Sequence, residues 1–212
     1  MSNKPQDFGS DAFAEQINVS RETLKRLTIL VERLTQWQAK INLVSKSTLE
    51  DAWQRHVLDS AQLMSHLPEP GPLIDLGSGA GFPGLVLALM GRVDVTLVES
   101  NGKKCAFMGE VLRSTGAAAT IFSGRIEDYS PSKPVRYVTA RALTSLDNLI
   151  ELSQPLLAEN GTCLFLKGRG VEEELTVTRE KWDIRVKKHP SISDSDGTVL
   201  EIDNIKAITR HD

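Results

Sequence analysis

A glycine-dense turn between an apolar strand and an apolar helix is the feature that most constrains this chain. The segment reads Leu73-Ile74-Asp75-Leu76-Gly77-Ser78-Gly79-Ala80-Gly81-Phe82-Pro83-Gly84. Glycine adopts positive φ angles freely and lets a ligand approach the main chain closely. In open α/β sheets, ligands bind beyond the carboxyl ends of the strands, where the strand order reverses. The segment therefore predicts a buried strand, a ligand-binding turn and a helix.

Short apolar runs alternate with helical patterns through the rest of the chain. We predict strands over residues 73–76, 93–98, 118–122, 137–140, 162–166, 183–188 and 199–208. We predict helices over residues 83–90, 103–114, 145–158 and 171–180. This alternation is typical of a doubly wound, mostly parallel α/β sheet. No helical pattern separates the last two strands, so we expect a hairpin whose connection, residues 192–197, is polar and mobile.

The residues before the turn have a helical pattern. One helical face is formed by Leu27, Leu30, Leu34, Trp37 and Ile41. Ser20 is a suitable N-cap for this helix, and a capping box of Ser47 and Glu50 predicts the start of a second one. Three prolines and a glycine within residues 68–72 cannot continue a helix. We predict a helical extension over residues 1–67, a Pro-rich linker over 68–72 and a ligand-binding domain over 73–212.

Composition excludes several classes of protein. The 212 residues are 40% hydrophobic and 25% charged, as in ordinary globular proteins. No run approaches the roughly 20 apolar residues of a membrane span, and the start of the chain lacks the core of a signal peptide. We expect a cytoplasmic protein without membrane contact, in which Cys105 and Cys163 are reduced thiols and no metal is bound. The net charge of -3 argues against a bulk electrostatic nucleic-acid binder, so any contact with RNA needs a local basic surface.

Two classes of nucleoside cofactor compete for the glycine turn. A dinucleotide fingerprint would carry its third glycine where this chain has Phe82. The actual pattern, Asp75 followed by Gly77, Gly79 and Gly81, resembles instead the S-adenosylmethionine loop of Rossmann-like methyltransferases. Glu99 follows Gly77 by 22 residues at the end of the next predicted strand, where it could accept hydrogen bonds from both ribose hydroxyls in either class.

Further segments in order along the chain point to one family. They are Ile41-Asn42-Leu43, residues 56–60, the glycine turn with Phe82-Pro83-Gly84, Glu99-Ser100 with Lys103-Lys104, Gly124-Arg125-Ile126-Glu127, Ala140-Arg141-Ala142 and Lys167-Gly168. In these segments the chain resembles the RsmG or GidB family, bacterial methyltransferases of guanine N7 in small-subunit rRNA. The resemblance implies a Rossmann-like class I methyltransferase with a seven-stranded, mostly parallel sheet and an N-terminal helical extension. Residues 73–212 would form its S-adenosylmethionine-binding methyltransferase domain.

The resemblance also implies a cofactor, a partner and site residues. The cofactor is S-adenosyl-L-methionine, and the partner is 16S rRNA or the small ribosomal subunit, bound by a chain that we expect to be a monomer. The expected cofactor contacts are Gly77, Gly79, Phe82, Glu99, Ile126, Glu127 and Arg141. We expect Arg141 to orient the reactants without acting as a general base. Independently of the resemblance, positive charge near the carboxyl ends of the predicted strands suggests RNA contacts at Lys103, Lys104, Arg125, Lys167 and Arg169.

The chemistry of guanine N7 agrees with these residues. N7 carries a lone pair and no proton, so positioning rather than a general base is the main requirement. Exocyclic amines are usually methylated beside an Asn/Asp-Pro-Pro-aromatic motif, and this chain has Thr139-Ala140-Arg141-Ala142 there. Methylation of cytosine C5 needs a cysteine nucleophile, for which Cys105 and Cys163 are poorly placed. His56 and Asp59 are expected to form a structural pair. A methyltransferase acting on another RNA atom, a nucleotide-binding oxidoreductase and a non-catalytic assembly factor stay open.

Overall fold

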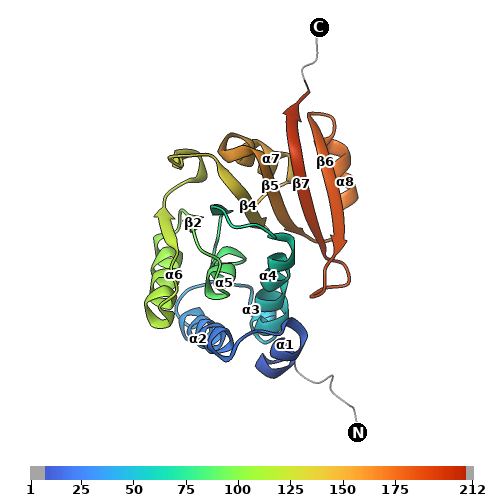
Figure 1. Cartoon of the computed structure of the whole chain (residues 1–212). Coiled ribbons are helices and arrows are strands. Elements are labelled where there is room, and N and C mark those ends of the chain that lie inside the picture. The colour runs from blue at the N-terminus through green and yellow to red at the C-terminus, as the bar shows by residue number, and fades with distance from the viewer. Residues whose placement is uncertain (1–7, 209–212) are drawn as a thin grey trace.

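A single seven-stranded sheet organises the chain. The computed structural model describes residues 8–208, so residues 1–7 of the predicted extension and 209–212 of the predicted domain lie outside it. The strands, drawn as arrows in Figure 1, are β1 (Leu73–Leu76), β2 (Val95–Glu99), β3 (Thr120–Ser123), β4 (Val135–Arg141), β5 (Leu157–Lys167), β6 (Trp182–Pro190) and β7 (Thr198–Ala207). Their order is β3-β2-β1-β4-β5-β7-β6. β1 to β5 pair in parallel, whereas β7 pairs antiparallel with β5 and β6. The predicted sheet and its terminal hairpin are confirmed.

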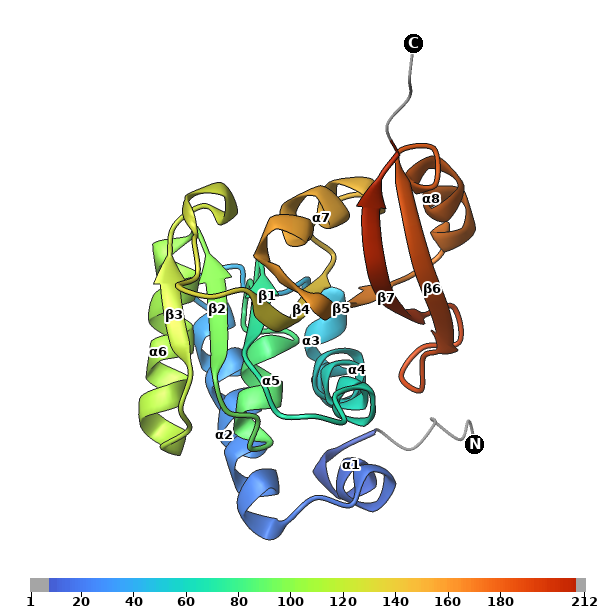
Figure 2. The ribbon, with the colours of Figure 1, turned by 45° about the horizontal axis from the view of Figure 1, so that its top comes forward.

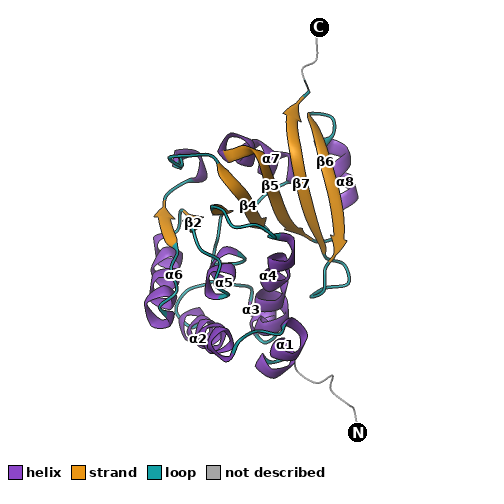
Figure 3. Cartoon of the chain, viewed as in Figure 1, coloured by secondary structure: helices purple, strands orange, loops and turns teal. Residues whose placement is uncertain are grey.

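Helices precede the sheet and connect its strands (Figure 3). Those before β1 are α1 (Ser10–Ile17), α2 (Arg21–Gln38), α3 (Lys46–Leu49), the π-helical turn η1 (Trp53–Leu58), α4 (Asp59–Ala61) and η2 (Gln62–His66). Those after β1 are α5 (Gly84–Leu89), α6 (Gly102–Thr115), η3 (Ile126–Asp128), α7 (Leu146–Ser153), η4 (Gln154–Leu156) and α8 (Val171–Thr178). The predicted N-cap of α2 is confirmed, because the Ser20 side chain accepts a hydrogen bond from the Thr23 N–H at 3.1 Å.

Three local predictions are wrong. The capping box at Ser47 does not form; the N-cap of α3 is Ser45, two residues earlier, whose hydroxyl bonds the side chains of Ser47 and Thr48. The helix predicted over 145–158 ends at Ser153, because Pro155 lacks an N–H and enters the short turn η4 before β5 begins. The connection at 192–197 is hydrogen-bonded to η1, α4 and η2 rather than mobile, as described below.

Both faces of the sheet are covered. One apolar cluster joins α2, α5 and α6 to the sheet through residues such as Leu30, Leu85 and Phe107 (Figure 2). The other cluster joins α7 and α8 to the opposite face through Ile150 and Leu175. The helices before β1 share the first cluster with the strands, so they have no separate core. The division at residues 68–72 into an extension and a domain stays a prediction.

The sheet brings the predicted functional segments to one edge. β1 lies between β2 and β4, which is where the strand order reverses. The carboxyl ends of these three strands carry the glycine turn, Glu99 and Arg141. None of the helices within residues 8–208 is both long and apolar enough to cross a bilayer.

Candidate active site

Two adjoining cavities open at the carboxyl ends of β1, β2 and β4. The first, which we name the Glu99 cavity, has a volume of about 720 Å³ and is lined by Glu99, Ile126 and Glu127 among others. The second, the Arg141 cavity, has a volume of about 510 Å³ and is lined by Phe82 and Arg141 among others. Gly77, Gly79, Lys104 and Ala142 line both cavities. The glycine turn therefore separates two compartments that meet at its main chain.

Backbone geometry explains the glycines of the turn. Gly77 and Gly79 have φ angles of 62° and 59°, which side-chain-bearing residues rarely adopt. A Cβ at Gly77 would lie 2.5 Å from Cδ1 of Leu143, whereas one at Gly79 would meet only the Gly77 carbonyl at 3.9 Å. The main chain at Gly79 is therefore open to a ligand.

Asp75 anchors the turn from beneath. Its fully buried carboxylate accepts hydrogen bonds from the Gly84 N–H at 3.1 Å and from the Thr139 hydroxyl at 2.7 Å. These bonds tie the beginning of α5 and the neighbouring strand β4 to β1. Desolvation raises the pKa of Asp75 to about 6, although the hydrogen bonds from Thr139, Ser78 and Gly84 act in the opposite direction.

Glu99 holds the glycine turn against the end of β2. One carboxylate oxygen accepts a hydrogen bond from the Gly79 N–H at 2.8 Å, and the other accepts one from the Asn101 N–H at 2.7 Å. The residue is 8% exposed and lines the Glu99 cavity. Each carboxylate oxygen has a second lone pair, so Glu99 can still accept hydrogen bonds from hydroxyls of a ligand.

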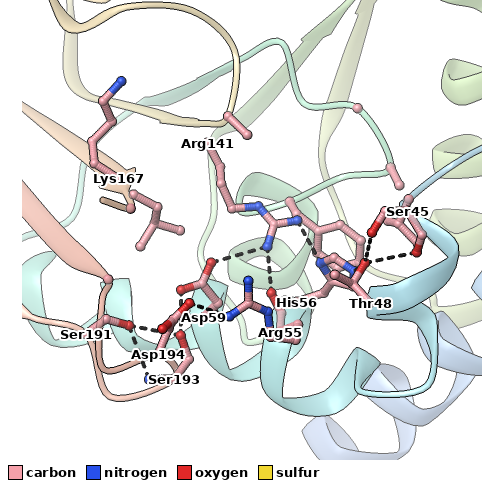
Figure 4. A pocket seen from close by; sticks show the side chains of 18 of the residues that line it. Ser45, Thr48, Arg55, His56, Asp59, Arg141, Lys167, Ser191, Ser193 and Asp194 are labelled. Carbon is pink, nitrogen blue, oxygen red and sulfur yellow. Dashed lines mark hydrogen bonds and ion pairs between the residues drawn. The ribbon is translucent and has the colours of Figure 1, made fainter. Parts of the chain in front are cut away.

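Arg141 joins β4 to the helices before β1 (Figure 4). Its guanidinium donates to the Arg55 carbonyl at 2.9 Å, to Oδ2 of Asp59 at 3.2 Å and to Nδ1 of His56 at 3.0 Å. It also lies over the ring of Phe82, 5.0 Å from the centroid, and that ring stacks on His56 at 4.9 Å. The predicted pair of His56 and Asp59 is thus bridged through Arg141.

The hydrogen bonds of His56 fix its protonation. Nδ1 accepts from the guanidinium, because arginine has only donors, so the proton is on Nε2 and is donated to the Thr48 hydroxyl at 3.0 Å. Desolvation, followed by the charges of Arg141 and Arg55, lowers the pKa of His56 to about 3. His56 is therefore a neutral structural partner of Arg141 at physiological pH.

The hairpin loop between β6 and β7 forms the far wall of the Arg141 cavity. The Ser193 hydroxyl donates to Oδ1 of Asp59 at 2.7 Å, and Asp194 forms an ion pair with Arg55. Gln62 accepts from the Ile192 N–H at 3.0 Å. These contacts join segments about 130 residues apart and explain why the loop, predicted to be mobile, is packed.

The predicted cofactor residues divide between the cavities. Gly77 and Gly79 line both, whereas Glu99, Ile126 and Glu127 line only the Glu99 cavity. Phe82 and Arg141 line only the Arg141 cavity, on the other side of the turn. The geometry thus separates a set suited to hold a nucleoside from a set that shapes a second pocket.

The predicted RNA-binding residues also differ in their surroundings. Lys104 lies at the junction of the two cavities, and Arg125 lines the Glu99 cavity. Within residues 8–208, none of Lys103, Lys104 and Arg125 forms an ion pair with a carboxylate. The side chain of Lys167 is only 10% exposed and is paired with Glu174 at 2.7 Å. Arg169 is exposed but paired with Asp196.

Sequence reasoning missed the residues that complete the second pocket. Arg55, Thr48 and the hairpin-loop residues Ser193 and Asp194 line the Arg141 cavity. No local sequence pattern indicates that the hairpin loop lines this cavity, because the contacts of the loop with Asp59 and Arg55 depend on the tertiary fold. Residues 56–60 were predicted to contain a structural pair, His56 and Asp59, but not to line a pocket.

Comparison with known proteins agrees with this fold. Two solved structures share the fold: the glycopeptide N-methyltransferase MtfA complexed with S-adenosyl-L-methionine and a ribosomal protein L11 methylase from Lactobacillus delbrueckii subsp. bulgaricus. MtfA has a TM-score of 0.57 at 12% identity, and the match covers 69% of this chain and 93% of the MtfA chain. The L11 methylase has a TM-score of 0.55 at 15% identity, and the match covers 75% of this chain and 79% of the methylase chain.

Sequence relatives are much closer. The ribosomal RNA small subunit methyltransferase G of Paramagnetospirillum magneticum is 50% identical over 92% of this chain and 95% of its own length. The protein of the same name from Rhodospirillum centenum is 48% identical over 93% of this chain and 92% of its own length. A family model described as GidB, rRNA small subunit methyltransferase G, matches residues 23–202. The chain therefore belongs to the GidB family of rRNA small subunit methyltransferases.

Proposed function

We propose that the chain transfers the methyl group of S-adenosyl-L-methionine to N7 of a guanine in 16S rRNA of the small ribosomal subunit. The observation that carries this proposal is the pair of cavities that meet at Gly77 and Gly79. A methyl donor in one cavity and an acceptor base in the other would meet where the cavities adjoin, beside the main chain of the turn. Membership of the GidB family supports the RNA substrate.

The Glu99 cavity fits the nucleoside part of the cofactor. Glu99 has lone pairs for the ribose hydroxyls, and its bond to the Gly79 N–H fixes the carboxylate beside the glycine turn. Ile126 offers an apolar surface and Glu127 an acceptor at the far side, where the adenine would lie. S-adenosylmethionine, when bound, supplies an electrophilic methyl group on a sulfonium.

The Arg141 cavity would take the target base, removed from its stack. N7 needs no base to remove a proton, so the residues of this cavity contribute alignment and the exclusion of water. Arg141 is a positioning residue in this proposal, because three of its five N–H donors hold Arg55, His56 and Asp59. It keeps Phe82 and the helices before β1 in place as the wall against which the base would lie.

Local charge would provide the RNA contacts despite the net charge of -3. Lys103, Lys104 and Arg125 are the proposed phosphate contacts, whereas Lys167 and Arg169 would first have to exchange their carboxylate partners. RNA affinity should consequently fall as salt rises, because bound phosphates release counterions. We also propose that the chain acts as a monomer in the cytoplasm.

The test combines cofactor binding with methyl incorporation. The full chain is titrated with S-adenosylhomocysteine or NAD, and small subunits from a strain lacking the enzyme are incubated with methyl-labelled S-adenosylmethionine. We expect binding of S-adenosylhomocysteine alone and label in 16S rRNA. Binding of NAD without methyl transfer would contradict the proposal in favour of an oxidoreductase, and RNA binding without transfer would favour an assembly factor.

A further inference from the structure

Two histidines and a glutamate meet away from both cavities, where the helices before β1 contact the terminal hairpin. His66 is the last residue of η2, His189 lies near the end of β6, and Glu201 lies on β7. Figure 1 shows the loop end of the β6–β7 hairpin beside α4. The three residues therefore join segments that are more than 120 positions apart in the chain.

Strand register places His189 and Glu201 on one face of the sheet. Lys187 is directly opposite Glu201, and His189 is two residues further along the same strand, so the side chains are diagonal neighbours. Nε2 of His189 lies 2.9 Å from Oε2 of Glu201. The ring of His66 approaches the same point from η2, with its centroid 4.3 Å from that of His189.

The ligand atoms are close enough for one ion. One ring nitrogen of each histidine and one carboxylate oxygen of Glu201 all lie within 4.8 Å of one another. Ligand atoms about 2.0–2.1 Å from a tetrahedral zinc ion are separated by roughly 3.3 Å. Movements of the ligand atoms by about 1 Å, through side-chain rotation, would therefore complete the site. All three residues are partly buried, which limits competition from bulk water.

The surroundings of the cluster are compatible with a bound metal ion. Nζ of Lys187 holds the other oxygen of Glu201 at 2.7 Å, which leaves Oε2 directed toward the histidines as an outer partner of a metal ligand would. His66 also lines a surface cavity of about 520 Å³, which gives an ion and a fourth, water ligand access.

We propose that His66, His189 and Glu201 bind one divalent transition-metal ion of the zinc class. Two imidazoles and one carboxylate are ligands that Zn²⁺ accepts, and their nitrogen content disfavours Mg²⁺ and Ca²⁺. With three protein ligands the site keeps one exchangeable position. The ion would fix the end of η2 to β6 two residues before Ser191, where the loop lining the Arg141 cavity begins.

Calorimetric titration of the untagged full chain, first treated with a chelator, tests the site. We expect one Zn²⁺ per chain and no comparable binding of Mg²⁺. The variants His66→Asn and His189→Gln should each weaken zinc binding by about tenfold or more, because each removes a ligand. The matched control Arg185→Gln, which removes a cross-strand ion pair with Asp203 on the same hairpin, should leave zinc affinity unchanged.

Several outcomes would overturn the assignment. They are the absence of zinc binding at a large excess of metal, undiminished binding in both histidine variants, and an equal response to Mg²⁺. Co²⁺ provides a second readout, since a thiolate charge-transfer band would place the metal on cysteine instead of this cluster. The measurement uses neither RNA nor S-adenosylmethionine, so it succeeds or fails independently of the proposed methyl transfer.

Discussion

Replacing Glu99 with glutamine should weaken cofactor binding strongly while the chain stays folded. The carboxylate accepts main-chain hydrogen bonds from Gly79 at 2.8 Å and Asn101 at 2.7 Å. Glutamine has a single acceptor oxygen, so one of these N–H groups would face an NH₂ group whichever way the amide is turned. The variant therefore disturbs the glycine turn and also loses the charge that would attract the ribose hydroxyls.

The expected size follows from the hydrogen bond that a ribose hydroxyl would donate to the Glu99 carboxylate. Loss of one hydrogen bond to a charged group is worth about 1.5–3 kcal/mol. At 1.4 kcal/mol per factor of ten, that corresponds to roughly 10- to 100-fold weaker binding of S-adenosylhomocysteine, measured by calorimetry. Glu151→Gln is the matched control, because Glu151 lines the same cavity. The affinity of this variant for S-adenosylhomocysteine should stay near that of the parent. A folded Glu99→Gln protein that binds within about threefold of the parent would refute the reasoning.

Three further predictions concern the anchor beneath the turn, the hairpin loop and the turn itself. Because burial raises the pKa of Asp75 from 3.8 to about 6, the parent should lose stability relative to Asp75→Asn as pH rises from about 4 to about 6; a difference in urea unfolding that is constant with pH contradicts this. Ser193→Ala removes a donor to the partly buried carboxylate of Asp59 and should cost about 1–3 kcal/mol of unfolding free energy, whereas the exposed control Ser195→Ala should change it little; equal effects would exclude a specific role for the loop bond. Gly77→Val, at a φ of 62° and against Leu143, should abolish S-adenosylhomocysteine binding in calorimetry, unlike Gly102→Ala, which meets no atom within 4 Å; near-normal affinity in a folded valine variant would remove the glycine turn from the site.

Local patterns were sufficient to predict most of the fold. The strand, glycine turn and helix around Gly77 follow from residue type and spacing alone, and Ser20 capped α2 as expected. The prediction was less successful where neighbouring helices compete with local preference, as in the π-helical turn η1 and the cap at Ser45. The predicted helix over 145–158 was too long because the apolar start of β5 fits either pattern.

The second cavity could not be derived from spacing. Arg141 meets His56 and Asp59 across more than 80 residues, and Ser193 meets Asp59 across 134. Such contacts depend on the order of the strands and on how the terminal hairpin packs over the helices. The sequence therefore predicted which residues lie at the strand ends, but not that Arg141 is held by the helical segment.

The identity of the methylated nucleoside tests the central claim most directly. Small subunits from a strain lacking the enzyme are treated with the chain and labelled S-adenosylmethionine, and the digested 16S rRNA is resolved by chromatography and mass spectrometry. We predict label in N7-methylguanosine alone, with no transfer when S-adenosylmethionine is omitted. Label in an exocyclic-amine or C5-methylated nucleoside, or no labelled nucleoside from either whole subunits or free rRNA, would contradict the account.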